Sequence, residues 1–192
     1  HLSFSQRVSN LILILVSDRF ICVSDSSKDS IPSYLLRRSA ILKKIVVIRN
    51  GVSIDTNKGC YIANSLQKDK KNPLYTKNTA VVVARLVYVK NPFFILNLIR
   101  ITPAIDKVIW FGDGDLMSKM KIKIKEMDLD DRVVLMGNCN RREVYEALRN
   151  SMIYLSASRW EGLGVANIEA LFFGCKLFIS SIPAHNEIAN IV

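Results

Sequence analysis

From Thr79 onward, short continuous runs of apolar residues alternate with longer stretches that have helical periodicity. The runs are rich in β-branched and aromatic residues and lie at 79–86, 107–113, 132–137, 152–158 and 176–181. Each is apolar throughout, which is typical of parallel strands covered on both faces. Helices are predicted between them at 92–101, 115–128, 141–150 and 164–174, with a last one beginning near Pro183. This order predicts an α/β fold with a Rossmann-like, doubly wound parallel sheet.

Three details refine the helix assignments. Asn91-Pro92 is a favourable helix start, with Asn as N-cap and Pro at the first helical position. Gly174 is a suitable stop for the helix 164–174. The segment 115–128 fits both strand alternation and a helical stripe, and its length and place between two strands favour a helix.

The block before Thr79 has a different composition. Two strands are predicted at 19–24 and 44–52, on either side of a polar helix at 25–38, and residues 56–78 are rich in Lys and Asn. We therefore predict the end of an incomplete N-terminal α/β domain at 1–56, a linker at 57–78, and a second domain at 79–192 whose C-terminal end is missing. We expect the chain, which starts with His1, to be an excerpt of a longer protein.

Composition excludes several classes. The apolar run at 11–16 is far shorter than a membrane span, and no signal peptide is visible. The four cysteines are far apart; Cys22 and Cys175 lie in apolar surroundings and are predicted to be buried thiols, which fits a reducing cytoplasm. The chain has only two histidines, which argues against a zinc site and against a Ser-His-Asp triad.

The formal net charge of +10 suggests an anionic partner, such as phosphate groups or an acidic membrane face. Nucleic acid is not favoured, because aromatic residues are not interleaved with the basic ones. The densest basic cluster is Lys119, Lys121, Lys123 and Lys125. A solvated helix face is the favoured interpretation of this cluster, and contact with acidic lipid is the alternative.

Candidate chemistry gathers at the ends of two predicted strands, where open α/β sheets bind ligands. Arg85 ends the first strand and Lys90 follows in the next loop, a pair of cations that suits a pyrophosphate but is also compatible with an ordinary surface loop.

A second group follows the strand 152–158. Glu161-Gly162-Leu163-Gly164 forms a turn before a helix whose free N–H groups favour phosphate. Glu169 lies inside that apolar helix and must have partners there. A ribose diol is one explanation, and an Arg side chain or an exposed edge of the helix is an equally compatible one.

These residues carry a family resemblance. "SASRWEGLGVANIEALFFGC" resembles the E-x7-E segment of the family 4 glycosyltransferases, retaining nucleotide-sugar enzymes of the GT-B architecture. The likeness continues in "VVVARLVYVKNP", "WFGDGDL", "LDDRVVLMGN", "VIRNGVSID" and "ISSIPAHNEI", in the order that the family has them.

The resemblance implies a role for each candidate residue. Arg85 and Lys90 would hold the donor diphosphate and stabilise it as it leaves. The amides of Gly162, Leu163, Gly164 and Val165 would bind the distal phosphate and the sugar. Glu161 would contact the transferred sugar and Glu169 the ribose.

The expected function is therefore a hexosyltransferase of cell-surface polysaccharide synthesis. It would take a nucleoside diphosphate sugar as donor and a glycan or lipid-linked glycan as acceptor. It would act in the cytoplasm, with a peripheral contact to the acidic inner membrane face. No cofactor or metal is expected; a metal held by Asp113 and Asp115, or by Asp128 and Asp130, is the minor alternative. A non-catalytic nucleotide-binding module is the alternative function, and the isolated fragment is expected to be inactive.

Overall fold

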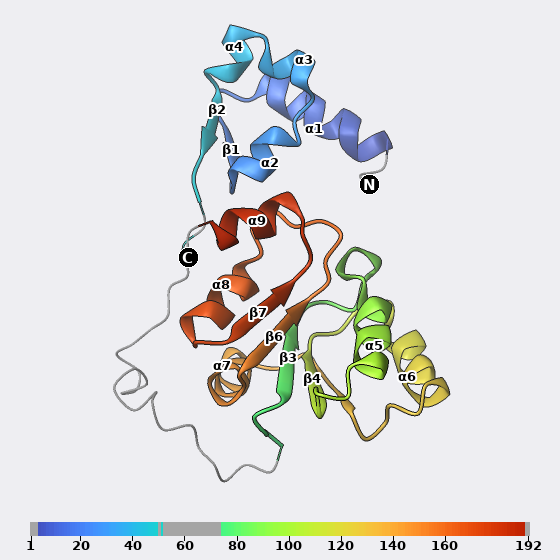
Figure 1. Cartoon of the computed structure of the whole chain (residues 1–192). Coiled ribbons are helices and arrows are strands. Elements are labelled where there is room, and N and C mark those ends of the chain that lie inside the picture. The colour runs from blue at the N-terminus through green and yellow to red at the C-terminus, as the bar shows by residue number, and fades with distance from the viewer. Residues whose placement is uncertain (1–3, 50, 52–73, 191–192) are drawn as a thin grey trace.

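The N-terminal block is a small α/β unit. A computed structural model describes residues 4–49, 51 and 74–190 of the chain (Figure 1). Strands β1 (Phe20–Cys22) and β2 (Ile45–Val47) pair in parallel. Four helices accompany them: α1 (Phe4–Val16), α2 (Asp25–Asp29), α3 (Ser33–Leu36) and α4 (Ser39–Leu42).

The larger unit is built on a five-stranded parallel sheet with the order β5-β4-β3-β6-β7. Its strands are β3 (Thr79–Val83), β4 (Lys107–Phe111), β5 (Val133–Gly137), β6 (Ile153–Ser156) and β7 (Lys176–Ile179). The chain winds outward from β3 to β5 and then returns to β6 on the other side of β3. The point at which the winding reverses therefore lies between β3 and β6, and ligands of such sheets bind beyond the strand ends there.

Helices cover both faces of this sheet, as the continuous apolar strands predict. One core joins α5 and α6 to the sheet around the buried Trp110, and the other joins α7 and α8 to it around the buried Tyr154. The helices of this unit are α5 (Pro92–Ile101), α6 (Met117–Glu126), α7 (Arg141–Asn150), α8 (Val165–Phe172) and α9 (Pro183–Ala189), with a 3-10 turn η2 (Tyr88–Lys90). The doubly wound α/β prediction is confirmed.

The sequence predictions fail at three local points. The helix expected at 25–38 is broken into α2 and α3, because Pro32 has no N–H to donate and disfavours helical geometry in the residue before it. Asn91 stands at the start of α5 in a left-handed conformation and does not cap it; its Oδ1 accepts a bond from Arg159 instead, at 2.9 Å. Helices α1 and α4 were not anticipated.

Other details agree with the sequence. The ambiguous segment 115–128 forms helix α6, and Gly174 follows α8 with a φ of 77°, as a helix stop requires. Cys22 and Cys175 are buried thiols, as predicted. The predicted linker and the Asn50-Gly51 turn lie almost entirely outside the described residues.

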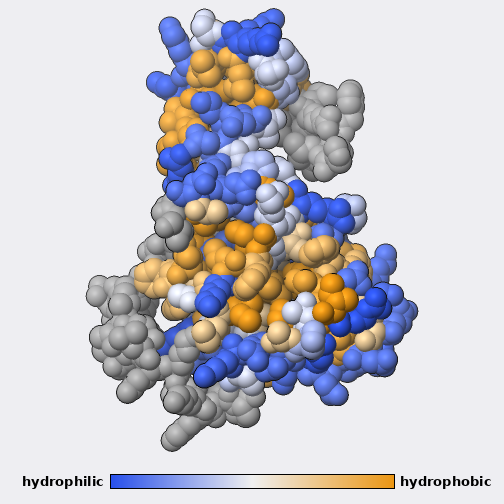
Figure 2. All heavy atoms as spheres, in the orientation of Figure 1, coloured by the Kyte–Doolittle hydropathy of each residue, from blue (hydrophilic) through white to orange (hydrophobic). Residues whose placement is uncertain are grey.

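The surface differs between the two ends of the sheet. Figure 2 shows apolar side chains gathered over β6, β7 and α5, where a pocket of about 300 Å³ is lined mainly by apolar residues that include Phe94 and Phe178. The surface over α6 is hydrophilic, because Lys119, Lys121, Lys123 and Lys125 are all exposed there. No helix in the described part of the chain has both the length and the apolarity needed to cross a membrane.

Candidate active site

The candidate site lies where the winding of the sheet reverses. Arg85 and η2 follow the carboxyl end of β3, and Ser158, Glu161 and the glycine turn follow the carboxyl end of β6. These are neighbouring strands, since Ala80 pairs with Ile153 and Val81 with Tyr154. The fold therefore brings the two predicted groups of site residues to one edge of the sheet, although they are far apart in the sequence.

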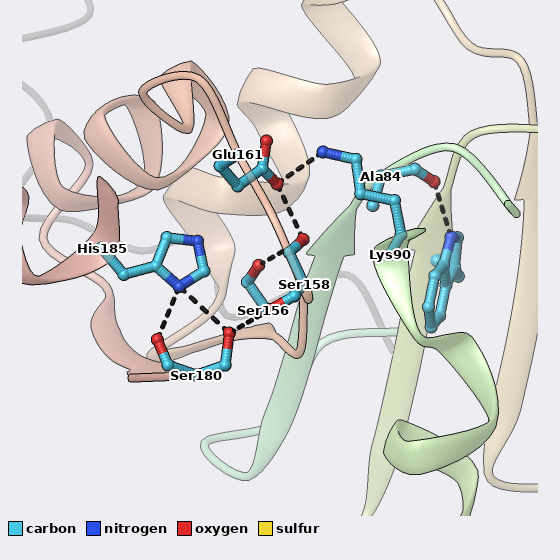
Figure 3. Close-up of polar contacts among 8 residues, drawn as sticks. Ala84, Lys90, Ser156, Ser158, Glu161, Ser180 and His185 are labelled. Carbon is cyan, nitrogen blue, oxygen red and sulfur yellow. Dashed lines mark hydrogen bonds and ion pairs between the residues drawn. The ribbon is translucent and has the colours of Figure 1, made fainter. Parts of the chain in front are cut away.

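Lys90 and Glu161 contact each other directly across this edge (Figure 3). Lys90 Nζ lies 2.5 Å from Glu161 Oε1, and the Ser158 hydroxyl donates to the same oxygen at 2.7 Å. The side chains of the pair are only 19% and 15% exposed, so water screens their charges less than on an open surface. Glu161 Oε2 receives no hydrogen bond from the described residues and is the oxygen left for a ligand.

The turn after Glu161 presents main-chain donors. Gly164 is the N-cap residue of α8 with a φ of 78°, and no side-chain cap bond forms at this end of the helix within the described chain. The first N–H groups of α8 thus point outward from a helix end that carries partial positive charge. Leu163 can offer a ligand only its backbone, because its side chain is buried in the protein.

Glu169 has protein partners. Its Oε1 accepts from Arg141 at 2.7 Å and from the Tyr145 hydroxyl at 2.9 Å, while its Oε2 accepts no bond from the residues described. The sequence left open an Arg partner and a ribose diol. The structure supplies the Arg partner, and the second oxygen stays available; the ribose assignment stays a prediction.

The backbone on either side of Arg85 packs closely against two glycines of a neighbouring loop. A Cβ on Gly112 would lie 2.3 Å from the Ala84 carbonyl oxygen, and one on Gly114 would lie 2.5 Å from that of Leu86. Only glycine permits the two backbones to approach this closely. The Arg85 side chain is exposed and forms no ion pair with any described residue, so its guanidinium is accessible to a ligand.

The two Asp-x-Asp pairs occupy turns. Asp113 Oδ1 accepts a bond from the backbone N–H of Gly114 at 2.7 Å, and Asp128 adopts a φ of 52° just after α6. Both are ordinary turn positions for Asp, and the expectation that no metal binds stays a prediction.

The N-terminal block forms hydrogen bonds with the glycine turn and with α9. The hydroxyls of Ser24 and Ser27 both donate to the carbonyl oxygen of Gly162, the second at 3.1 Å. In the other direction, the Glu187 carboxylate of α9 accepts from the backbone N–H groups of Asp25 and Ser26 at the start of α2. We call these bonds the clasp. Of its residues only Gly162 was singled out in the sequence, since short polar side chains in a loop carry no distinctive pattern.

Arg141 and Tyr145, which the sequence analysis did not identify as site residues, have raised pKa values. The hydrogen bond to Glu169 is the main cause that raises the pKa of Arg141. Burial, followed by the bond to Glu169, raises the pKa of Tyr145. Both changes keep these side chains protonated as donors to Glu169. Arg141 and Tyr145 are four residues apart on α7, a spacing that places them on one helix face and could have suggested a shared partner.

Comparison with known proteins places the chain in a family. The family described as "Glycosyl transferases group 1" matches residues 64–190, which is more than half of the chain. The chain belongs to this family. Family 4 within it stays a prediction from the sequence motifs.

One relative and one solved structure of similar fold illustrate the match. The chain is 28% identical over 189 residues to the Escherichia coli UDP-Gal:alpha-D-GlcNAc-diphosphoundecaprenol alpha-1,3-galactosyltransferase, which covers 93% of this chain and 44% of the relative. Anabaena HepE, solved in complex with UDP and glucose, superposes with a TM-score of 0.77 and 17% identity over 98% of this chain and 51% of that one. The fold is therefore GT-B-like, and the chain spans about half the length of the proteins it matches.

Proposed function

We propose that the chain is the donor-binding part of a retaining hexosyltransferase that uses a nucleoside diphosphate sugar. The observation that carries this proposal is the Lys90–Glu161 pair beside the uncapped start of α8, at the reversal point of a parallel sheet. A carboxylate suits sugar hydroxyls, and a cation with free helix amides suits phosphate. The similar proteins support it, since one is a galactosyltransferase named for UDP-Gal and the other was solved with UDP and glucose.

In the proposed reaction, the bond between the sugar and the diphosphate breaks and negative charge develops on the diphosphate. Lys90 Nζ has three N–H groups, so it can hold Glu161 and still donate to a phosphate oxygen. Arg85 and the start of α8 add two further sources of positive charge. Glu161 Oε2 faces the transferred sugar, which becomes electron-poor as the bond breaks. We propose that these residues make a metal ion unnecessary; turnover that disappears with EDTA and returns with Mn²⁺ would contradict this.

The acceptor is proposed to be a glycan or lipid-linked glycan of cell-surface polysaccharide synthesis, because the Escherichia coli relative is named for a diphosphoundecaprenol acceptor. The enzyme would work in the cytoplasm, with the exposed lysines of α6 against acidic lipid at the inner membrane face. Binding to vesicles that contain phosphatidylglycerol should then weaken as salt rises, because exposed charges are screened within about 10 Å at 0.1 M ionic strength. Lack of binding at low salt would leave only a solvated helix face.

The test of donor binding is calorimetric titration of the protein with UDP and with a panel of nucleotide sugars. Lys90→Met should weaken UDP binding by roughly 10-fold to 100-fold, as expected for a lost hydrogen bond between charged groups worth about 1.5–3 kcal/mol. Lys176→Met is the matched control, because Lys176 is exposed at the start of β7, at the opposite edge of the sheet. Equal effects of the two variants would contradict the proposed site.

The alternative function is a nucleotide-binding module without catalysis. We propose that these 192 residues bind nucleotide but do not transfer sugar alone, because they span 44% of the Escherichia coli relative. Transfer by this chain to a lipid-linked acceptor would contradict that view. A longer form that binds donor and lacks transfer would favour the non-catalytic module.

A further inference from the structure

Two buried polar atoms beside the glycine turn have no partner. They are Nε2 of His185 and Nδ2 of Asn167, on side chains that are 1% and 2% exposed. Neither atom bonds to the other or to any described residue. Buried polar atoms are nearly always hydrogen-bonded, because an unmade bond in the interior costs the full desolvation of the group. Both atoms therefore call for a ligand.

The hydrogen bonds of the His185 ring show what Nε2 can accept. Nδ1 lies 2.8 Å from the carbonyl oxygen of Ser180, which can only accept, so Nδ1 carries the proton. The Ser180 hydroxyl donates to the Ser158 carbonyl at 2.6 Å and is 3.2 Å from Nδ1. Nε2 is then an unprotonated acceptor that requires an O–H or N–H group. In Figure 3 this edge of the ring faces the side on which Glu161 and Lys90 lie.

The charge state of the ring agrees with this assignment. Burial is the largest influence on the pKa of His185 and lowers it below the ordinary value, so the ring is neutral near pH 7. The bond to Ser180 and the charge of Glu161 raise this pKa by smaller amounts, and Lys90 lowers it. The bond to Ser180 fixes the tautomer, as is common for functional histidines.

Asn167 supplies the complementary group. A side chain at Gly164 would place its Cβ 2.7 Å from Asn167 Nδ2 and 3.6 Å from His185 Cδ2, the ring carbon next to Nε2. The donor of Asn167 and the acceptor edge of His185 thus both lie beside Gly164, where a side chain on residue 164 would clash with Asn167. A ligand hydroxyl beside Gly164 can accept from Asn167 and donate to His185, and so complete both bonds at once.

We propose that Asn167 and His185 together bind one hydroxyl group of the transferred sugar, and that they determine which donor sugar is accepted. The inference rests on the proposed function, which puts the sugar at the turn between Glu161 and α8. Glu161 accepts a bond from one hydroxyl, and the Asn167–His185 pair recognises a second hydroxyl in both hydrogen-bonding directions. A site that bonds a hydroxyl in this way rejects analogues that lack it, because its own groups are then left unpaired.

Two substitutions at His185 separate ligand binding from structural support. His185→Asn keeps a donor near the Nδ1 position for Ser180 and removes the Nε2 acceptor. His185→Gln keeps an acceptor near the Nε2 position and loses the bond to Ser180. Asn167→Leu, which removes the amide donor, keeps a similar size and adds no charge, is the second substitution to test. Each variant is titrated with UDP and with UDP-glucose and UDP-galactose, and its thermal unfolding is recorded.

The sugar-dependent gain is the ratio of the affinity for the preferred nucleotide sugar to the affinity for UDP. We expect His185→Asn and Asn167→Leu to reduce this gain about 10-fold while UDP affinity stays within twofold, and His185→Gln to keep most of it. A nucleotide sugar with the recognised hydroxyl replaced by hydrogen should bind the wild-type protein and His185→Asn equally.

Three other outcomes would contradict the inference or the proposed function, and each can be told from the others. If all variants lose melting temperature but keep the wild-type gain, a buried water fills the space and the inference is overturned. If the wild-type protein binds neither UDP nor nucleotide sugars, the proposed function itself fails. If UDP binds and no sugar adds affinity, the proposed nucleotide site stands and the sugar inference alone is overturned.

Discussion

The link between Arg141 and Glu169 offers the sharpest test of how α8 is held. Arg141→Ala removes the 2.7 Å charged hydrogen bond and leaves Glu169 with the Tyr145 hydroxyl as its described partner. A hydrogen bond between charged groups contributes about 1.5–3 kcal/mol. The Arg141 side chain is 62% exposed, however, and exposed ion pairs contribute at most about 1 kcal/mol. We therefore expect a loss of about 1 kcal/mol in the free energy of unfolding.

Thermal unfolding measures this loss. For a protein of this size, 1 kcal/mol lowers the melting temperature by about 2–4 °C. Arg142→Ala is the control, because Arg142 is exposed and the neighbouring residue of the same helix. The same change should weaken UDP binding by roughly fivefold if Glu169 binds the ribose, since 1 kcal/mol in its placement corresponds to that factor.

A double substitution checks the cause. In a Glu169→Gln background the carboxylate charge is already gone, so Arg141→Ala should cost clearly less than in the wild-type protein. If Arg141→Ala and Arg142→Ala behave alike in both assays, the ion pair contributes nothing. If the cost of Arg141→Ala is unchanged in the Gln background, its effect comes from packing against Tyr145 and the reasoning is refuted.

Three further predictions concern kinetics, the glycine loop and pH. Glu161→Gln should depress kcat more than it raises KM for the donor, because charge develops on the sugar only in the transition state; an unchanged kcat measured by steady-state kinetics would contradict its role. Gly114→Ala should weaken UDP binding, since a Cβ 2.5 Å from the Leu86 carbonyl oxygen displaces the Arg85 loop, and calorimetry that finds wild-type affinity would disprove this. Burial keeps the folded-state pKa of His185 below 6.5, so the unfolded chain binds more protons at mildly acid pH and stability falls as pH decreases through and below 6.5. Melting curves should show a smaller fall for His185→Asn, and an equal fall would assign the effect to other groups.

The sheet and its ligand-binding edge could be predicted because each depends on local patterns. Continuous apolar runs identify all five strands of the larger sheet, and the alternation with helices sets their parallel direction and the end at which a site forms. Lys90 and Glu161 could be proposed as site residues for the same reason, since each follows a strand directly. Which strands are neighbours is a property of the whole fold, so their direct contact could not be read from spacing.

The parts that sequence reasoning missed depend on distant contacts. Arg141 and Tyr145 look like any exposed residues of a polar helix until α7 is packed against α8. Asn91 has the right residue type and position for a cap, but the 3-10 turn before it imposes a left-handed backbone that directs its side chain to Arg159. His185 gives no sign in the sequence that one of its nitrogens is bonded and the other is not.

The clasp has an evolutionary consequence. Ser24 has two duties at once: its oxygen accepts from the Ser27 N–H as the cap of α2, and its hydroxyl donates to the Gly162 carbonyl, 138 residues away in the chain. Asp caps helices as well as Ser does but has no proton to donate when ionised. The acceptor is the main-chain carbonyl oxygen of residue 162, which is present whichever amino acid stands there. Selection to keep this hydrogen bond therefore acts only on position 24. Among homologues that keep this arrangement, position 24 should vary between Ser and Thr and exclude Asp, even though its own helix would tolerate the exchange.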